Sequence, residues 1–224
     1  MFVPIMFVPI IPGIWKDTLS NYISDYDKYH NSWTGLSIRV SLQIIRNYGF
    51  IPYNLFHINN SNQLSDVVIR LFSSIFIHSG IAHLAFNILA LGYLGGYAER
   101  SVGIPRYVLI YILAGIAGAV FHSVIASYIL GSGHVILIGA SGAISGVLGI
   151  AAAAGNRSAY YWLIIQIAFA IYGSFAAIAI AFTAHIGGFI AGVILTKLFV
   201  GIERMKRAKY FVPSRKNYST WWKE

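Results

Sequence analysis

The chain has 224 residues, of which 57% are hydrophobic and only 10% are charged, and its mean hydropathy is +0.67. A soluble domain usually has about a quarter of its residues charged. Residues 71–196 contain only four charged side chains: Glu99, Arg100, Arg106 and Arg157. We therefore expect this stretch to lie in a lipid bilayer rather than in water.

The net charge of +9 does not indicate nucleic-acid binding, because eight of the sixteen Lys and Arg residues lie at Lys197 or beyond. This position, directly after the last apolar segment, predicts a cytoplasmic tail near anionic lipid. The absence of cysteine excludes disulfides, thiolate zinc sites and cysteine nucleophiles. A metalloprotease site is not expected either, since the chain contains no His-Glu-x-x-His run. An aspartyl membrane protease would need two buried aspartates, but no Asp follows Asp66.

The N-terminal region contains no clear membrane span. Residues 1–15 are uncharged but shorter than the about 20 residues that cross a bilayer. They indicate a weak first span, an interfacial segment or a truncated span. Residues 37–48 suit an amphipathic helix, and the polar run at 59–62 predicts a loop. We divide the chain into an N-terminal segment with the weak span and an external loop region (1–70), a membrane core (71–203) and a basic cytoplasmic tail (204–224).

Five apolar segments follow, and we expect each to be a membrane helix because none shows the alternating pattern of barrel strands. They lie near 81–98, 106–130, 141–155, 159–174 and 183–201. Lys and Arg occur in every second connection, which predicts that the loops at 99–106 and 156–158 and the C-terminus are cytoplasmic. The sequence thus predicts an all-α, multi-pass protein of the cell membrane.

The segment at 141–155 is too short to cross a bilayer alone. At 1.5 Å per residue it covers about 22 Å of a hydrocarbon core about 30 Å thick. We expect other helices to surround it and a polar cavity to reach its external end, where Gly139-Ala140-Ser141-Gly142 stands.

Polar side chains in an apolar core are costly, so each one needs an explanation. Ser141 and His185 both fall near the predicted external end. So does His83, which shares a helix face with Asn87. A histidine next to a serine can make it a nucleophile, and His83, Asn87 and a backbone N–H near Ser141 could stabilise an oxyanion. Taken singly, these histidines more often serve helix packing.

Glycine stripes suggest how the serine and the histidine could meet. Gly142, Gly146 and Gly149 mark the third segment, and Gly188 and Gly192 mark the fifth. Small residues at such spacing allow two helices to approach closely, which could bring the His185 imidazole toward Ser141. We expect Ser145 to bond to its own helix backbone. His122 and His134 are predicted to be loop or interface residues, and Gln166 is a further polar residue without a predicted role.

Several motifs resemble those of the rhomboid intramembrane serine proteases, over about Tyr48 to Thr196. Gly139-Ala140-Ser141-Gly142 resembles their nucleophile motif, and His185 with Gly188 and Gly192 resembles their base-bearing helix. His83-Leu84-Ala85-Phe86-Asn87 is similar to their oxyanion motif. Tyr93-Leu94-Gly95-Gly96 before Glu99-Arg100, and Tyr48-Gly49-Phe50-Ile51-Pro52, also fit.

The resemblance implies a six-helix bundle, of which the first helix is poorly represented here. It also implies a Ser–His dyad that hydrolyses peptide bonds in or near transmembrane segments of protein substrates, without a metal or cofactor. Without a carboxylate in the dyad, we expect packing alone to orient His185. The alternative is a catalytically inactive relative that binds and escorts transmembrane helices. A transporter or channel is disfavoured, because the apolar segments contain too few charges.

The chain departs from the family pattern at two positions. Ile69-Arg70 stands where the family has Trp-Arg, and Ser145 replaces an aromatic residue that packs near the base in some members. The family's lid, the loop before the last helix, corresponds to about Gly173 to Ala181.

Overall fold

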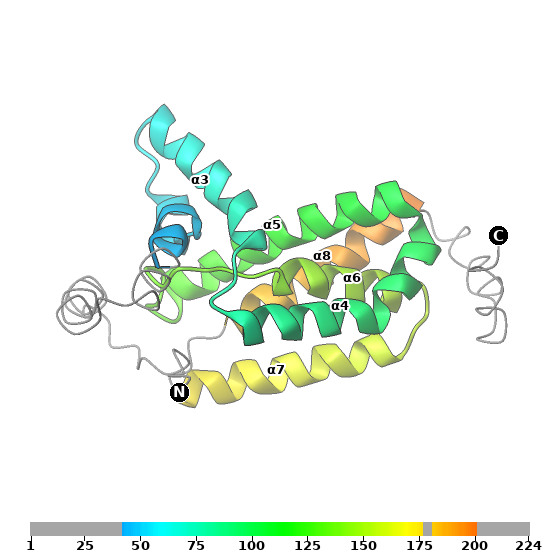
Figure 1. Cartoon of the computed structure of the whole chain (residues 1–224). Coiled ribbons are helices and arrows are strands. Elements are labelled where there is room, and N and C mark those ends of the chain that lie inside the picture. Colours follow the sequence, from blue (N-terminus) through cyan, green and yellow to red (C-terminus); the bar gives the residue numbers. More distant parts are fainter. Residues whose placement is uncertain (1–41, 177–180, 201–224) are drawn as a thin grey trace, which may run out of the picture.

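The computed structural model describes residues 42–176 and 181–200 (Figure 1). The predicted weak first span, the first part of the amphipathic helix and the basic tail lie outside the described residues. Within those two ranges the secondary structure is helical, and an isolated antiparallel bridge joins Phe50 to Leu137.

The helices follow one another with short connections. After a helix over 42–48, the chain forms η1 (Pro52–Phe56), α3 (Ser61–Ser73), η2 (Ser74–Phe76), α4 (Ile81–Val102), α5 (Ile104–Tyr128), α6 (Ser141–Ala153), α7 (Ser158–Ala176) and α8 (Phe182–Val200). The five predicted apolar helices are therefore confirmed as helices, with ends within about four residues of the expected ones. The predicted lid is wrong at its start, because Gly173 and Ser174 belong to the last turns of α7.

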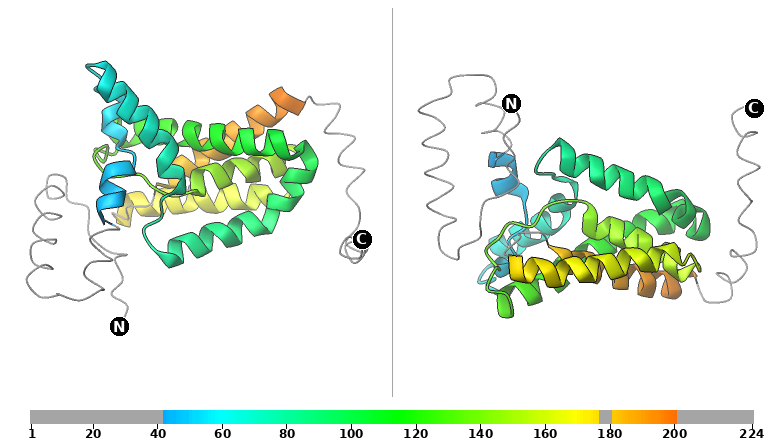
Figure 2. Two further views of the ribbon diagram at one scale, coloured as in Figure 1. Left: turned by 45° about the horizontal axis from the view of Figure 1, so that its top comes forward. Right: turned by 90° about the horizontal axis from the view of Figure 1, so that it is seen from below.

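Helix α6 is the centre of the bundle. It has only 13 residues and packs against α4, α5, α7 and α8. Every residue from Ala143 to Ala152 is buried, which leaves α6 no outward face. The two further views show the same long helices around it, with α3 projecting away from one end (Figure 2). The short apolar helix is thus enclosed by its neighbours, as its length required.

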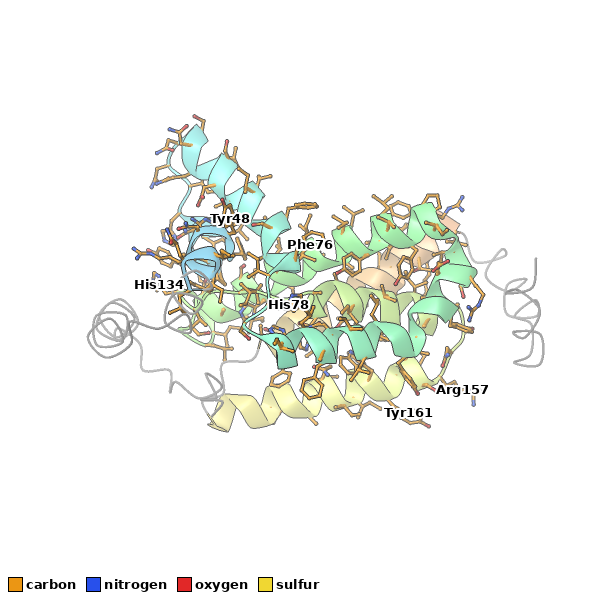
Figure 3. All side chains as sticks on the ribbon, in the orientation of Figure 1. Tyr48, Phe76, His78, His134, Arg157 and Tyr161 are labelled. Carbon is orange, nitrogen blue, oxygen red and sulfur yellow. The ribbon has the colours of Figure 1, made fainter. Side chains whose placement is uncertain are left out.

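The two ends of the bundle differ in charge. The α4–α5 connection, the α6–α7 connection and the end of α8 lie at one end, whereas α3 and the N-termini of α4, α6 and α8 lie at the other (Figure 1). The basic residues of α4 to α8 and their connections, Arg100, Arg106, Arg157 and Lys197, all belong to the first end, whereas Arg46 and Arg70 lie with α3 at the other. Arg157 and His134 mark the opposite ends in Figure 3. The candidate site residues at the helix N-termini are therefore far from the basic end.

The outer surface of the bundle is apolar. Large side chains that are more than half exposed include Phe86 and Tyr93 on α4, Ile164 on α7 and Leu198 on α8. Soluble monomers rarely expose so much large apolar surface. Among the described helices, α5 and α8 are long and apolar enough to cross a membrane, by length and composition.

Helix α3 is capped and tied to the segment before it. The Asn60 side chain accepts a hydrogen bond from the Gln63 N–H at 2.9 Å, so the loop predicted at 59–62 ends at this residue. Arg70 donates to Asp66 at 2.6 Å and to the carbonyl oxygens of Arg46 and Gly49 at 2.8 and 3.1 Å. The arginine thus holds residues 46–49 against α3 without a tryptophan beside it.

Candidate active site

Ser141 and His185 form a hydrogen-bonded pair although 44 residues separate them. Ser141 is the first residue of α6, and His185 lies in the first turn of α8, where it is only 9% exposed. The His185 Nε2 atom is 2.7 Å from Ser141 Oγ. This is the contact that a histidine base makes with a serine nucleophile.

Glycines bring α6 and α8 close enough for this contact. A Cβ atom on Gly188 would overlap the carbonyl oxygen of Gly142, and one on Gly192 would overlap that of Gly146. By contrast, a Cβ on Gly142 would lie at an ordinary 3.6 Å from the Ala184 carbonyl oxygen. Of these predicted supporting glycines, Gly188 and Gly192 allow the approach by lacking a side chain. Gly142 takes part through its carbonyl oxygen, the atom nearest to a Cβ placed on Gly188.

The other ring nitrogen of His185 also has a partner. Its Nδ1 atom lies 2.6 Å from Oε1 of Gln166, which projects from α7 and is only 5% exposed. The expectation that packing alone orients His185 is therefore wrong. Sequence analysis assigned Gln166 no role. One feature of the sequence could have indicated this role: Gln166 is an amide in an otherwise apolar helix, and a buried amide needs a hydrogen-bond partner.

His83 lies beside Ser141, across Gly139. Gly139 has a φ of +116°, and a Cβ placed on it would be 2.7 Å from Cε1 and Nε2 of His83 and 3.8 Å from Ser141 Oγ. The Ser79 N–H donates to His83 Nδ1 at 3.4 Å. Because Nδ1 accepts, the neutral ring carries its proton on Nε2, the nitrogen that faces Gly139. The His83 Nε2–H therefore faces Gly139, two residues before Ser141.

His78 lies between η2 and α4, with its ring centroid 5.0 Å from that of His83. Burial lowers the pKa of His78, although a hydrogen bond with the Phe76 backbone acts in the opposite direction. The lowered pKa favours a neutral His78 beside His83.

Asn87 is buried one turn after His83, and its Nδ2 atom donates to the His83 carbonyl oxygen at 2.8 Å. An amide nitrogen has two N–H groups, so this bond uses one of them. The described contacts do not join Asn87 to Ser141. Its predicted part in an oxyanion hole stays a prediction.

The loop before Ser141 is held by segments that precede the bundle. Phe50 and Leu137 exchange two backbone hydrogen bonds, of 3.0 and 2.7 Å, and the Gly139 N–H donates to the Ser74 carbonyl oxygen at 2.9 Å. Phe50 is fully buried. The motif around Phe50 therefore anchors the turn that presents Ser141 at the start of α6. Among the described residues no side chain caps that helix start, so its first-turn N–H groups can serve the site.

The remaining polar residues lie outside the pair. Ser145 donates to the Ser141 carbonyl oxygen at 2.8 Å, as predicted. His122 is buried at the interface of α5 and α8, 2.6 Å from Thr183 Oγ1. His134, in the α5–α6 connection, stacks on Tyr53. Among the residues that the structure describes, no three His, Asp or Glu side chains form a group that could hold a metal ion.

Comparison with known proteins finds a matching family model and several relatives. The family model described as the Rhomboid domain matches residues 65–202. The rhomboid protease GluP of Bacillus subtilis is 40% identical over 130 residues, which cover 55% of this chain and 24% of that protein. RHOMBOID-like protein 1 of Arabidopsis thaliana is 31% identical over 139 residues, or 58% of this chain and 34% of that protein.

A shorter relative is matched over most of its length. The putative rhomboid protease YdcA of Bacillus subtilis is 31% identical over 146 residues, which cover 62% of this chain and 69% of that protein. The chain thus spans only a minor part of GluP and of the Arabidopsis protein. No solved structure matches it significantly.

Proposed function

Because the chain belongs to the rhomboid family, and is thereby an integral membrane protein, we propose that it is an intramembrane serine endopeptidase. Its substrates are the transmembrane segments of other membrane proteins, cleaved within or near the bilayer. The observation that supports this proposal most directly is the 2.7 Å hydrogen bond between Ser141 and His185. The alternative, an inactive protein that binds and escorts transmembrane helices, requires neither that pair nor its geometry.

The reaction follows from the positions of these groups. Ser141 Oγ attacks the carbonyl carbon of the scissile peptide bond while its proton passes to His185 Nε2. His185 then donates that proton to the leaving amine, which leaves an ester on Ser141. A water molecule, deprotonated by His185, then attacks the ester carbon. The proton returns from His185 to Ser141 Oγ as the second product leaves as the free acid.

Negative charge develops on the carbonyl oxygen during both steps. The His83 Nε2–H beside Gly139, the amide of Asn87 and the N–H groups at the start of α6 are the donors that we assign to it. The positive end of the α6 dipole acts in the same direction. No metal or cofactor has a role in this scheme.

We place the bundle across the cell membrane with a cytoplasmic C-terminus, in the six-helix arrangement that the family implies. The apolar outer surface and the basic residues at one end support this placement. Water then reaches Ser141 from the opposite, external end.

The proposal is tested by a fluorophosphonate probe, which reacts with activated serines. We expect the purified chain in detergent to be labelled and the Ser141→Ala variant to remain unlabelled. Ser145→Ala is the matched control, because its serine lies one turn away on the same helix with its hydroxyl bonded to the Ser141 carbonyl oxygen. It should be labelled like the wild type. A folded wild type that is not labelled would favour the helix-binding alternative.

The place of His83 in the site is tested by Gly139→Ala. The new Cβ would meet the His83 ring at 2.7 Å, in a backbone conformation that alanine rarely adopts. We expect turnover to fall by about 10²-fold, in the range that loss of one oxyanion donor costs. The measurement is cleavage of a transmembrane substrate per folded molecule.

Gly131→Ala controls for backbone strain alone. Gly131 also has a positive φ, of +64°, but a Cβ there would meet nothing within 4 Å. This variant should lose some stability and keep its turnover. Equal turnover in both variants would mean that His83 takes no part in the reaction.

A further inference from the structure

The His185 imidazole is held between two helices. Its Nε2 atom meets Ser141 of α6 at 2.7 Å, and its Nδ1 atom meets Gln166 of α7 at 2.6 Å. Both His185 and Gln166 are buried, so bulk water is a poor competitor for either bond. The second contact therefore bears directly on the chemistry of the first.

The oxygen of an amide can only accept a hydrogen bond. Opposite Gln166 Oε1, Nδ1 of His185 must therefore carry the ring proton. In a neutral imidazole the other nitrogen is then unprotonated, which leaves Nε2 free to accept the proton of Ser141. The opposite tautomer would present an N–H to the serine and could not act as its base.

We propose that Gln166 is the positioning residue for His185: it selects the base-competent tautomer and fixes the ring toward Ser141. This inference rests on the proposed protease function. In Ser-His-Asp triads a buried carboxylate fulfils this task. Here a neutral amide does so, and it avoids the cost of an ionised carboxylate in an apolar helix. Gln166 exchanges no proton: the Ser141 proton moves to Nε2 and then to the leaving amine.

Two further groups in this region, Ser145 and Phe182, do not supply this bond. Ser145, one turn after Ser141, donates to the Ser141 carbonyl oxygen. The Phe182 ring packs edge-on against the imidazole of His185, with the ring centroids 5.9 Å apart. This contact restricts the tilt of the imidazole, but a phenyl ring offers Nδ1 no acceptor atom. Packing thus limits the ring plane, and Gln166 determines which nitrogen carries the proton.

Two substitutions distinguish positioning from simple packing. Gln166→Leu keeps most of the side-chain volume and removes the acceptor, whereas Gln166→Glu keeps an acceptor oxygen in either protonation state. If Gln166 positions His185, we expect the kcat of Gln166→Leu to fall at least about 10-fold. The upper limit is the loss of about 10⁴-fold that the wrong histidine tautomer causes in a serine triad. KM should not change, since in this role Gln166 acts only through His185. Gln166→Glu should be markedly more active than Gln166→Leu.

A packing role predicts the reverse order. The apolar Leu would then be tolerated, and Glu would destabilise the bundle by placing an ionisable group in its interior. Ile165→Leu serves as the control on the same helix, because Ile165 is nearly half exposed and points away from the core. Its kcat should equal that of the wild type. Wild-type kcat in Gln166→Leu would overturn the proposal.

The tautomer itself can be measured without any activity. In the Ser141→Ala background, Nε2 has lost its serine partner, and Gln166 remains to select the tautomer. ¹⁵N NMR of histidine-labelled protein should show His185 protonated on Nδ1, and adding Gln166→Leu should shift its proton to Nε2. His185→Asn assigns the signals.

An unchanged tautomer in Gln166→Leu would exclude the positioning role even if the enzyme is active. An inactive wild type would instead exclude the proposed function. The tautomer measurement would then still decide whether Gln166 orients the ring.

Discussion

Ser141→Ala and His185→Ala are each expected to abolish cleavage of a transmembrane substrate while the protein still folds and inserts. Ser141 supplies the attacking oxygen, and His185 accepts its proton across the 2.7 Å hydrogen bond. Loss of either group removes the same step, so each variant should lose about 10⁴-fold or more in turnover. For the same reason the double variant should be no worse than either single one.

Cleavage assays with reconstituted protein, corrected for the folded fraction, measure this effect. His122→Ala is the matched control, because His122 is also a buried histidine and also contacts a hydroxyl, that of Thr183 at 2.6 Å. It should lose stability but keep its turnover per folded molecule. Substantial cleavage by Ser141→Ala would exclude the mechanism.

Gly188→Ala is expected to lower both the melting temperature in detergent and the rate of cleavage. Its Cβ would overlap the carbonyl oxygen of Gly142 and lie 3.4 Å from that of Ala114. Both neighbours are backbone atoms, which cannot rotate away, so α8 must move outward from α6. We expect a loss of about 1–3 kcal/mol of stability, as for other overpacked interiors. Because His185 lies one turn before Gly188, the same movement lengthens its hydrogen bond to Ser141.

The control for this variant is Gly92→Ala in α4. A Cβ at Gly92 would meet nothing within 4 Å, and alanine favours a helix by up to about 1 kcal/mol over glycine. This variant should melt at or slightly above the wild-type temperature and cleave normally. If Gly188→Ala melted at the wild-type temperature, α6 and α8 could not pack through their glycines.

The positions of the helices could be predicted from the sequence because they depend on local composition. Long apolar runs broken by Gly, Asn or charge mark α4 to α8, and the spacing of Gly188 and Gly192 indicates a helix face that approaches another closely. The enclosure of α6 was likewise predictable, since a segment of its length cannot cross a bilayer alone. These properties require no knowledge of how the helices are rotated.

Contacts between particular side chains were decided by the tertiary structure. The bond from Gln166 to His185, the ordinary contact distance at Gly142 and the ties from Arg70 to the chain before α3 depend on the rotation and separation of neighbouring elements. In an apolar helix nearly every face is equally hydrophobic, so periodicity does not show which face meets which neighbour. Helix packing sets that rotation, and it alone placed the Gln166 amide within 2.6 Å of the imidazole.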